Sequence, residues 1–144
     1  MKKIQKNWII LAGFIALIGV AIHIAAIFGG SSWYAYFGAP PGVVESARNG
    51  TWLAPVGALV IAGLMAICAA YAFSALGIIR RLPLLRTCLA GMATICLLRA
   101  LVLWPLMINH PELRNTFEIV AAIVWGLAGI GFVFGLRWVQ LNKP

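Results

Sequence analysis

Three ionisable side chains stand inside long apolar stretches, and they are the residues of this sequence that could do chemistry. Arg99 follows Leu97 and Leu98 in the third stretch, Glu118 lies near the start of the fourth, and His23 lies near the end of the first. An ionisable group is costly inside a lipid bilayer, so each of these residues marks a candidate functional site. A guanidinium binds carboxylates and other acceptor oxygens, and an imidazole titrates near neutral pH.

Arg99 requires a partner because of its depth in the predicted membrane. It lies thirteen residues beyond Arg86, which corresponds to about 20 Å along a helix. Glu118 is the obvious protein partner, since it begins the next helix on the same side after one short loop. Ala122 and Trp125 share the helical face of Glu118, so we expect this face to point inward.

The sequence leaves three interpretations of these residues open. In the structural interpretation, Arg99 and Glu118 form an internal bridge, His23 is hydrogen-bonded to a carbonyl, and these contacts only orient the helices. In the functional interpretation, a wet pocket in the outer half of the bundle lets Arg99 bind an anionic headgroup, a quinone carbonyl or a peptide carboxylate. Trp33 and Trp104 then join it as ligand-binding residues. In the third interpretation, His23 and Glu118 form a proton relay.

The elements that must position these residues are predicted from composition and hydropathy. The chain has 144 residues, of which 63% are hydrophobic and 10% are charged, whereas about a quarter of a soluble domain is charged. Uncharged apolar runs of about twenty residues predict membrane-spanning helices. We therefore expect a single membrane domain over residues 1–144, an all-α four-helix bundle of two antiparallel hairpins. The spans are expected at about residues 8–28, 52–79, 86–108 and 117–141.

Small residues recur at every fourth position of the second predicted span. The row consists of Ala54, Ala58, Ala62, Ala66, Ala70 and Ser74. Small residues let helix backbones approach closely in lipid, so this span is predicted to be the hub of the bundle. Gly131 and Gly135 form a GxxxG pair on the last span, which packs against the first helix or joins two copies of the chain.

The longest connection covers residues 29–51, and we expect it to lie on the outer side. Its aromatic residues suit the headgroup zone of a membrane. Residues 43–48 are predicted to form a short interfacial helix that begins after Pro41 and ends at Gly50.

The distribution of Lys and Arg predicts the orientation of the chain. The amino end carries three of these residues, the connection from Arg80 to Arg86 three, and the carboxyl end two, whereas Arg48 and Arg114 stand alone in the opposite loops. Because positive residues favour the cytoplasmic side, both termini are expected there, in a bacterial inner membrane.

Several chemistries lack their residues in this sequence. There is no Asp, no glycine-rich phosphate loop and no zinc-ligand spacing, and Cys68, Cys88 and Cys96 are isolated in apolar runs, as small buried residues would be. The basic residues gather at segment ends and do not form a nucleic-acid-binding face. We therefore expect no enzyme activity, no metal, no cofactor and no nucleic-acid partner.

Three parts of the sequence together resemble small uncharacterised four-helix inner-membrane proteins of Proteobacteria: residues 33–39 (WYAYFGA), residues 71–77 with residues 80–86, and Leu97-Leu98-Arg99. The resemblance implies the same topology and localisation, and it attaches no activity. Our leading hypothesis is a non-enzymatic membrane protein that binds a lipid- or quinone-like amphiphile near Arg99. One alternative is an accessory subunit or immunity-type protein that contacts a membrane-protein partner, or a second copy, through its glycine faces and outer loop. Another alternative is a small proton-coupled carrier acting as an oligomer.

Overall fold

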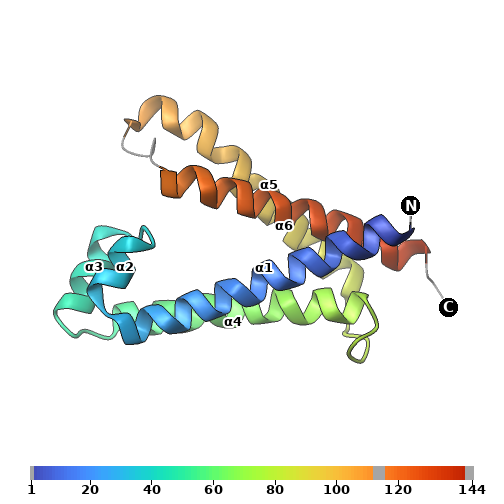
Figure 1. Ribbon diagram of the computed structural model, residues 1–144, viewed down its shortest axis with the longest axis horizontal. Helices are drawn as coiled ribbons and strands as arrows, with labels where there is room; N and C mark the ends of the chain where they lie inside the picture. The colour runs from blue at the N-terminus through green and yellow to red at the C-terminus, as the bar shows by residue number, and fades with distance from the viewer. Residues whose placement is uncertain (1, 112–115, 142–144) are drawn as a thin grey trace. The chain divides into compact units, whose positions relative to one another are not determined.

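The computed structural model describes residues 2–111 and 116–141, which form helices joined by turns and contain no strand. The helices are α1 Lys2–Gly29, α2 Ser31–Tyr36, α3 Pro41–Arg48, α4 Leu53–Ala75, α5 Leu85–Asn109 and α6 Thr116–Leu141 (Figure 1). Four of them, α1, α4, α5 and α6, are long and apolar enough to cross a membrane. The all-α fold with four spans is therefore confirmed, and the chain is a small multi-pass membrane protein. Arg114 and Lys143, the second basic residue of the carboxyl end, entered the charge prediction and lie outside the described residues.

The long helices differ from the predicted spans mainly at two ends. The helix α1 begins at Lys2, before the predicted start at residue 8. The basic segment before residue 8 consists of residues that are compatible with a helix, so it extends the span toward the amino end. The helix α4 ends at Ala75, four residues before the predicted end at residue 79. Gly77 stops it there with a φ of 74°. The N–H of Ile78 donates a hydrogen bond to the carbonyl of Phe73 at 3.0 Å. This is the 6→1 hydrogen bond of the Schellman motif, which commonly ends a helix at a glycine.

The chain divides into two compact units, and each is described by itself. Unit 1 contains residues Met1–Ala16 and Cys68–Pro144, and unit 2 contains Leu17–Ile67. The first half of α1 and the last part of α4 thus belong to unit 1, together with α5 and α6. The prediction of one membrane domain over residues 1–144 stays a prediction.

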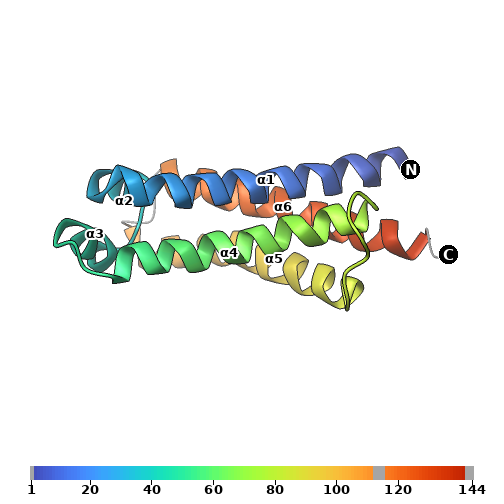
Figure 2. The same ribbon diagram turned by 90° about the horizontal axis from the view of Figure 1, so that it is seen from below.

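In unit 1, α5 and α6 run side by side in opposite directions (Figures 1 and 2). The start of α1, the connection between α4 and α5, and the end of α6 all lie at the same end of this unit. Ile9, Leu89 and Phe132, from α1, α5 and α6, are fully buried and form the centre of its apolar core. The basic segments of the sequence therefore share one end of unit 1.

The glycines of α6 allow α1 to approach its backbone closely. A methyl group added at Gly131 would come within 2.6 Å of both the Ala12 Cβ and the Trp8 carbonyl oxygen. One added at Gly135 would meet the side chain of Ile9. Of the two predicted roles for the GxxxG pair, packing against the first helix is the one found within unit 1.

The opposite side of α6 receives α5 in a similar way. A methyl group at Gly129 would come within 2.7 Å of Leu97, and one at Gly126 would make an ordinary contact with Ala100 at 3.7 Å. In unit 1, α6 therefore lies between α1 and α5. The role of the alanine-rich span as hub of the whole bundle stays a prediction.

The alanine row of α4 is buried only in part. Ala58 and Ala62 are buried, but Ala66 is exposed and Ala70 is half-buried. The reason is geometric: a step of four residues rotates by about 40° around the helix, so the row drifts off the packed face. The buried face instead continues at Ala69, because it follows the helical repeat of 3.6 residues. The predicted packing of Ala66 against a neighbouring helix stays a prediction.

Unit 2 ends in a small cap made of α2 and α3 (Figure 2). Tyr34 of α2 is buried together with Ala26 at the end of α1 and with Ala54 and Ala58 at the start of α4. The short helix after Pro41 is confirmed as α3. The sequence did not predict α2, whose six residues are closed by a positive-φ residue, Gly38.

A buried serine, Ser46, ties α3 to the start of α4. Its Oγ accepts a hydrogen bond from the N–H of Ala54 at 3.0 Å and lies 2.6 Å from Oγ1 of Thr51. The first N–H groups of a helix lack partners within the helix, so Ser46 caps α4 from a distance of eight residues in sequence.

Candidate functional site

Arg99 and Glu118 form an ion pair between α5 and α6. The guanidinium Nη2 of Arg99 donates a hydrogen bond to Oε2 of Glu118 at 3.2 Å. The side chain of Glu118 is 16% exposed and that of Arg99 is 44% exposed. The pair predicted by the structural interpretation is thus present within unit 1, but its positive member lies at the surface of the helix pair.

The sequence places Glu118 in this position through the packing of α6. Glu118 lies in the first turn of α6, where the helix dipole favours a negative charge. Ala122 and Gly129 on the same face are buried against the rest of unit 1. The predicted inward orientation of this face is confirmed, and it carries the carboxylate to the edge of α5.

Arg99 is exposed because of its place beside the buried face of α5. Around the helix, Cys96 and Ala100 lie on one side of Arg99 and are buried. Ile95 and Val102 lie on its other side and are exposed. The guanidinium has several N–H donors, and its hydrogen bond in this structure is the one to Glu118. The side chain of Arg99 is 44% exposed, so the arrangement is open at the surface of unit 1. The wet pocket of the functional interpretation stays a prediction.

Trp104 does not share the face of Arg99. It lies five residues further along α5, which is about 140° around the helix, and it is exposed. The structure therefore does not bring this predicted ligand-binding residue to the ion pair.

His23 and Trp33 belong to unit 2. The Nδ1 of His23 is 2.8 Å from the carbonyl oxygen of Gly19, one turn back on α1, which is the carbonyl contact of the structural interpretation. Trp33 is exposed on α2, where it lines a shallow hollow of about 330 Å³ with Tyr36 and Phe37. A joint pocket of these two residues with Arg99 and Glu118 stays a prediction.

Tyr34 is the buried polar group of the cap in unit 2. Its side chain is 7% exposed, and its hydroxyl has no hydrogen-bond partner among the described residues. Burial disfavours the charged phenolate and therefore raises the pKa of Tyr34 above its ordinary value. This tyrosine contributes apolar packing between α2 and the helix ends beneath it.

Sequence reasoning missed the two serines that organise the ends of α4. Ser46 caps its start, and Ser74 bonds to the backbone of the connection that follows its end. Both are nearly inaccessible, at 6% and 5% exposed. The available signal was at Ser74, a polar residue among apolar neighbours near the end of a predicted span, a pattern that indicates a fixed hydrogen-bond partner.

No known protein family, curated protein or solved structure matches this chain. Fold and site therefore define the class on their own: a small multi-pass membrane protein with a half-exposed ion pair between two of its spans.

Proposed function

We propose that this chain is a small non-enzymatic membrane protein that binds the polar group of a membrane amphiphile, of quinone-like chemistry, at Arg99 and Glu118. The observation that carries the proposal is the exposure of Arg99. The side chain of Arg99, within an apolar span, is 44% exposed, and among the described residues the hydrogen-bond partner of its guanidinium is Glu118. Ionisable residues at such positions are rare and are generally functional.

The charge of the pair selects among the ligands considered for Arg99. Glu118 balances the guanidinium at 3.2 Å, so the site as a whole carries little net charge. An anionic headgroup or a peptide carboxylate would meet the negative field of Glu118 together with the donors of Arg99. A neutral acceptor, such as a quinone or ester carbonyl, receives an N–H donor without that repulsion. The pair therefore favours a neutral carbonyl over an anion.

The surface beside Arg99 suits the apolar part of such a molecule. Ile95 and Val102 lie on neighbouring positions of its helical face, and both are exposed, as is Leu98. If the carbonyl of an amphiphile binds Arg99, its apolar tail would pack along these side chains, as the acyl chains of the bilayer do. The class of ligand is thus an apolar molecule with one carbonyl-bearing end.

A titration with defined probes tests the proposal. The purified full-length protein in detergent is titrated with a short-tailed benzoquinone and, separately, with a zwitterionic short-chain phospholipid. We expect saturable binding of the benzoquinone, and at least a tenfold loss of affinity in Arg99→Ala. Thr94→Ala is the matched control, because Thr94 is exposed on the same helix and bonds only back to Ala90. Absence of saturable benzoquinone binding, or equal binding by Arg99→Ala, would contradict the proposal.

We also propose that the basic end of unit 1 faces the cytoplasm of a bacterial cell and that the membrane is the inner one. The support is the segregation of Lys and Arg to the start of α1, the connection after α4 and the end of α6. A reporter that is active only in the cytoplasm should work when fused after α6. It should be inactive when inserted in the turn between α2 and α3, and the reverse pattern would contradict this orientation.

The alternative of an accessory or immunity-type protein relies on the glycine faces and the outer loop as its contact surfaces. Gly131 and Gly135 are occupied by α1 within unit 1, so a partner helix would have to displace part of the chain's own core. The outer segment with α2 and α3 remains its possible contact surface. The proton-coupled carrier stays a prediction, to be tested by pH-dependent flux in Glu118→Gln.

A further inference from the structure

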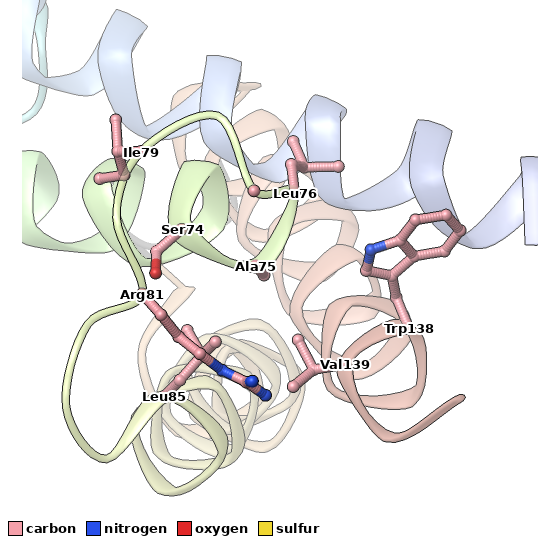
Figure 3. Close-up of a pocket in the computed structure, with 9 residues that line it drawn as sticks. Ser74, Ala75, Leu76, Ile79, Arg81, Leu85, Trp138 and Val139 are labelled. Carbon is pink, nitrogen blue, oxygen red and sulfur yellow. The ribbon is translucent and has the colours of Figure 1, made fainter. Parts of the chain in front are cut away.

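A second polar site lies at the opposite end of unit 1 from the start of α6. It is a pocket of about 350 Å³ between the end of α4, the connection that follows it, the start of α5 and the end of α6. Its walls are mostly apolar, and the charged residue that lines it is Arg81. Figure 3 shows the guanidinium of Arg81 extending between Leu85 and Val139, with the indole of Trp138 on the far side.

The charge around this pocket is of one sign. The chain's three acidic residues, Glu45, Glu112 and Glu118, all lie in other segments of the sequence. The start of α1, the connection after α4, the start of α5 and the end of α6 are basic and meet at this end of unit 1 (Figure 1). Their Lys and Arg residues are Lys2, Lys3, Lys6, Arg80, Arg81, Arg86 and Arg137. Among the described residues Arg81 makes no ion pair, in contrast to Arg99.

Arg81 is held in place by its neighbours along the chain. The hydroxyl of Ser74 donates to the carbonyl of Arg80 at 3.3 Å and accepts from the N–H of Leu82 at 2.9 Å. One buried serine thus binds the peptide groups on both sides of Arg81. The hydroxyl of Tyr71 donates to the carbonyl of Pro83 at 3.1 Å and fixes the next turn of the same connection. A guanidinium on such a fixed backbone loses less conformational entropy when it binds a ligand.

We propose that this pocket binds the phosphate headgroup of an anionic phospholipid of the surrounding bilayer. A guanidinium is the preferred partner of a phosphate because its donors match two phosphate oxygens at once. Basic pockets between membrane helices, at the end of a bundle that carries its Lys and Arg, are suited to acidic headgroups. The apolar lining from Leu76, Leu85 and Val139 receives the glycerol and the first part of the chains. The volume of about 350 Å³ fits a headgroup and leaves the rest of the lipid in the bilayer.

The proposal is tested by native mass spectrometry of the full-length protein titrated with short-chain phosphatidylglycerol or with phosphatidylcholine of the same chain length. We expect tighter binding of phosphatidylglycerol and at least a tenfold loss of its affinity in Arg81→Gln. Arg80→Gln is the matched control: it removes the same charge one residue away but does not line the pocket. A general attraction to basic residues near a membrane surface is about fivefold per charge, so Arg80→Gln should lose no more than that.

Further variants separate position from charge. Ser74→Ala keeps every charge and should weaken phosphatidylglycerol binding, while Arg81→Lys should restore part of the affinity lost in Arg81→Gln. Arg99→Ala should bind phosphatidylglycerol as the wild type does, so that this site and the Arg99 site fail or hold independently. Equal losses in Arg80→Gln and Arg81→Gln, or equal binding of the two lipids, would overturn the proposal. Displacement of the lipid by millimolar glycerol phosphate would also overturn it and would assign the pocket to a soluble phosphate ester.

Discussion

The guanidinium of Arg99 lies 3.2 Å from the carboxylate of Glu118, yet the side chain of Arg99 is nearly three times as exposed as that of Glu118, at 44% against 16%. The two residues are thus held in one contact but differ in what else can reach them. Glu118 is positioned by the packing of α6, whereas Arg99 stands where α5 meets its surroundings. The pair joins two spans and at the same time presents donors to a ligand.

The first prediction concerns the energy of this contact. In a double-mutant cycle with Arg99→Ala and Glu118→Ala, the coupling free energy should be about 1 kcal/mol, because a half-exposed pair is worth little more. Unfolding in a mild detergent, followed by loss of helical signal, measures it. A coupling near zero would mean that the two side chains do not interact in the folded protein.

A second prediction concerns the close approach of α1 to α6. Gly131→Ala should lower the free energy of unfolding by about 1–3 kcal/mol, because the added methyl overpacks against Trp8 and Ala12. Gly91→Ala is the control, since a methyl group there meets nothing within 4 Å. It should be neutral or stabilise the helix by about 0.5–1 kcal/mol. Equal effects of Gly131→Ala and Gly91→Ala on the free energy of unfolding would contradict the close approach of α1 to α6.

The third prediction tests the cap supplied by Ser46. Ser46→Ala leaves the N–H of Ala54 without its side-chain acceptor and should cost about 1–3 kcal/mol of stability. Ser32→Ala removes a longer and exposed bond to Gly29 and should change stability by less than about 0.5 kcal/mol. Hydrogen exchange at the start of α4 gives a local readout. Unchanged protection of those amides in Ser46→Ala would contradict the capping role.

The fourth prediction is a dependence of stability on alkaline pH. Burial raises the pKa of Tyr34 in the folded state above the value of about 10 in an unfolded chain. Above about pH 10, Tyr34 loses its proton more readily in the unfolded state than in the folded state, so the free energy of unfolding falls as pH rises. Well below this pH Tyr34 is protonated in both states, and its ionisation does not change stability. Tyr34→Phe should reduce the loss of stability between pH 9 and 11, measured by unfolding at each pH. Identical profiles for wild type and Tyr34→Phe would exclude this contribution.

The spans could be predicted from the sequence because hydropathy alone decides which segments enter a membrane. Their ends were less predictable, since they depend on single bonds. Gly77 ends α4 before residue 79 although the apolar run continues through Ile78 and Ile79. The helix α2, which the sequence did not predict, likewise depends on a few local contacts. Six residues have too few internal hydrogen bonds to show a pattern, and packing of Tyr34 holds them.

The candidate site divides in the same way. Its depth in a predicted span was sufficient to identify Arg99 as a candidate site residue. Helical spacing was sufficient to predict that Glu118 faces inward. The exposure of Arg99 was not predictable, because it depends on how far α5 rotates against α6. The pocket at Arg81 was missed since its walls come from segments far apart in sequence. Ser74, which holds it, shows its partners only in three dimensions.

Native mass spectrometry of the protein released gently from its own membrane tests the central claim most directly. The account predicts that the wild type retains a neutral carbonyl-bearing amphiphile. Arg99→Ala should lose it, and Arg81→Gln should keep it. A wild-type protein that carries no such molecule, or an Arg99→Ala variant that carries the same molecule, would contradict the account and leave the Arg99–Glu118 contact as a bridge that only orients α5 and α6.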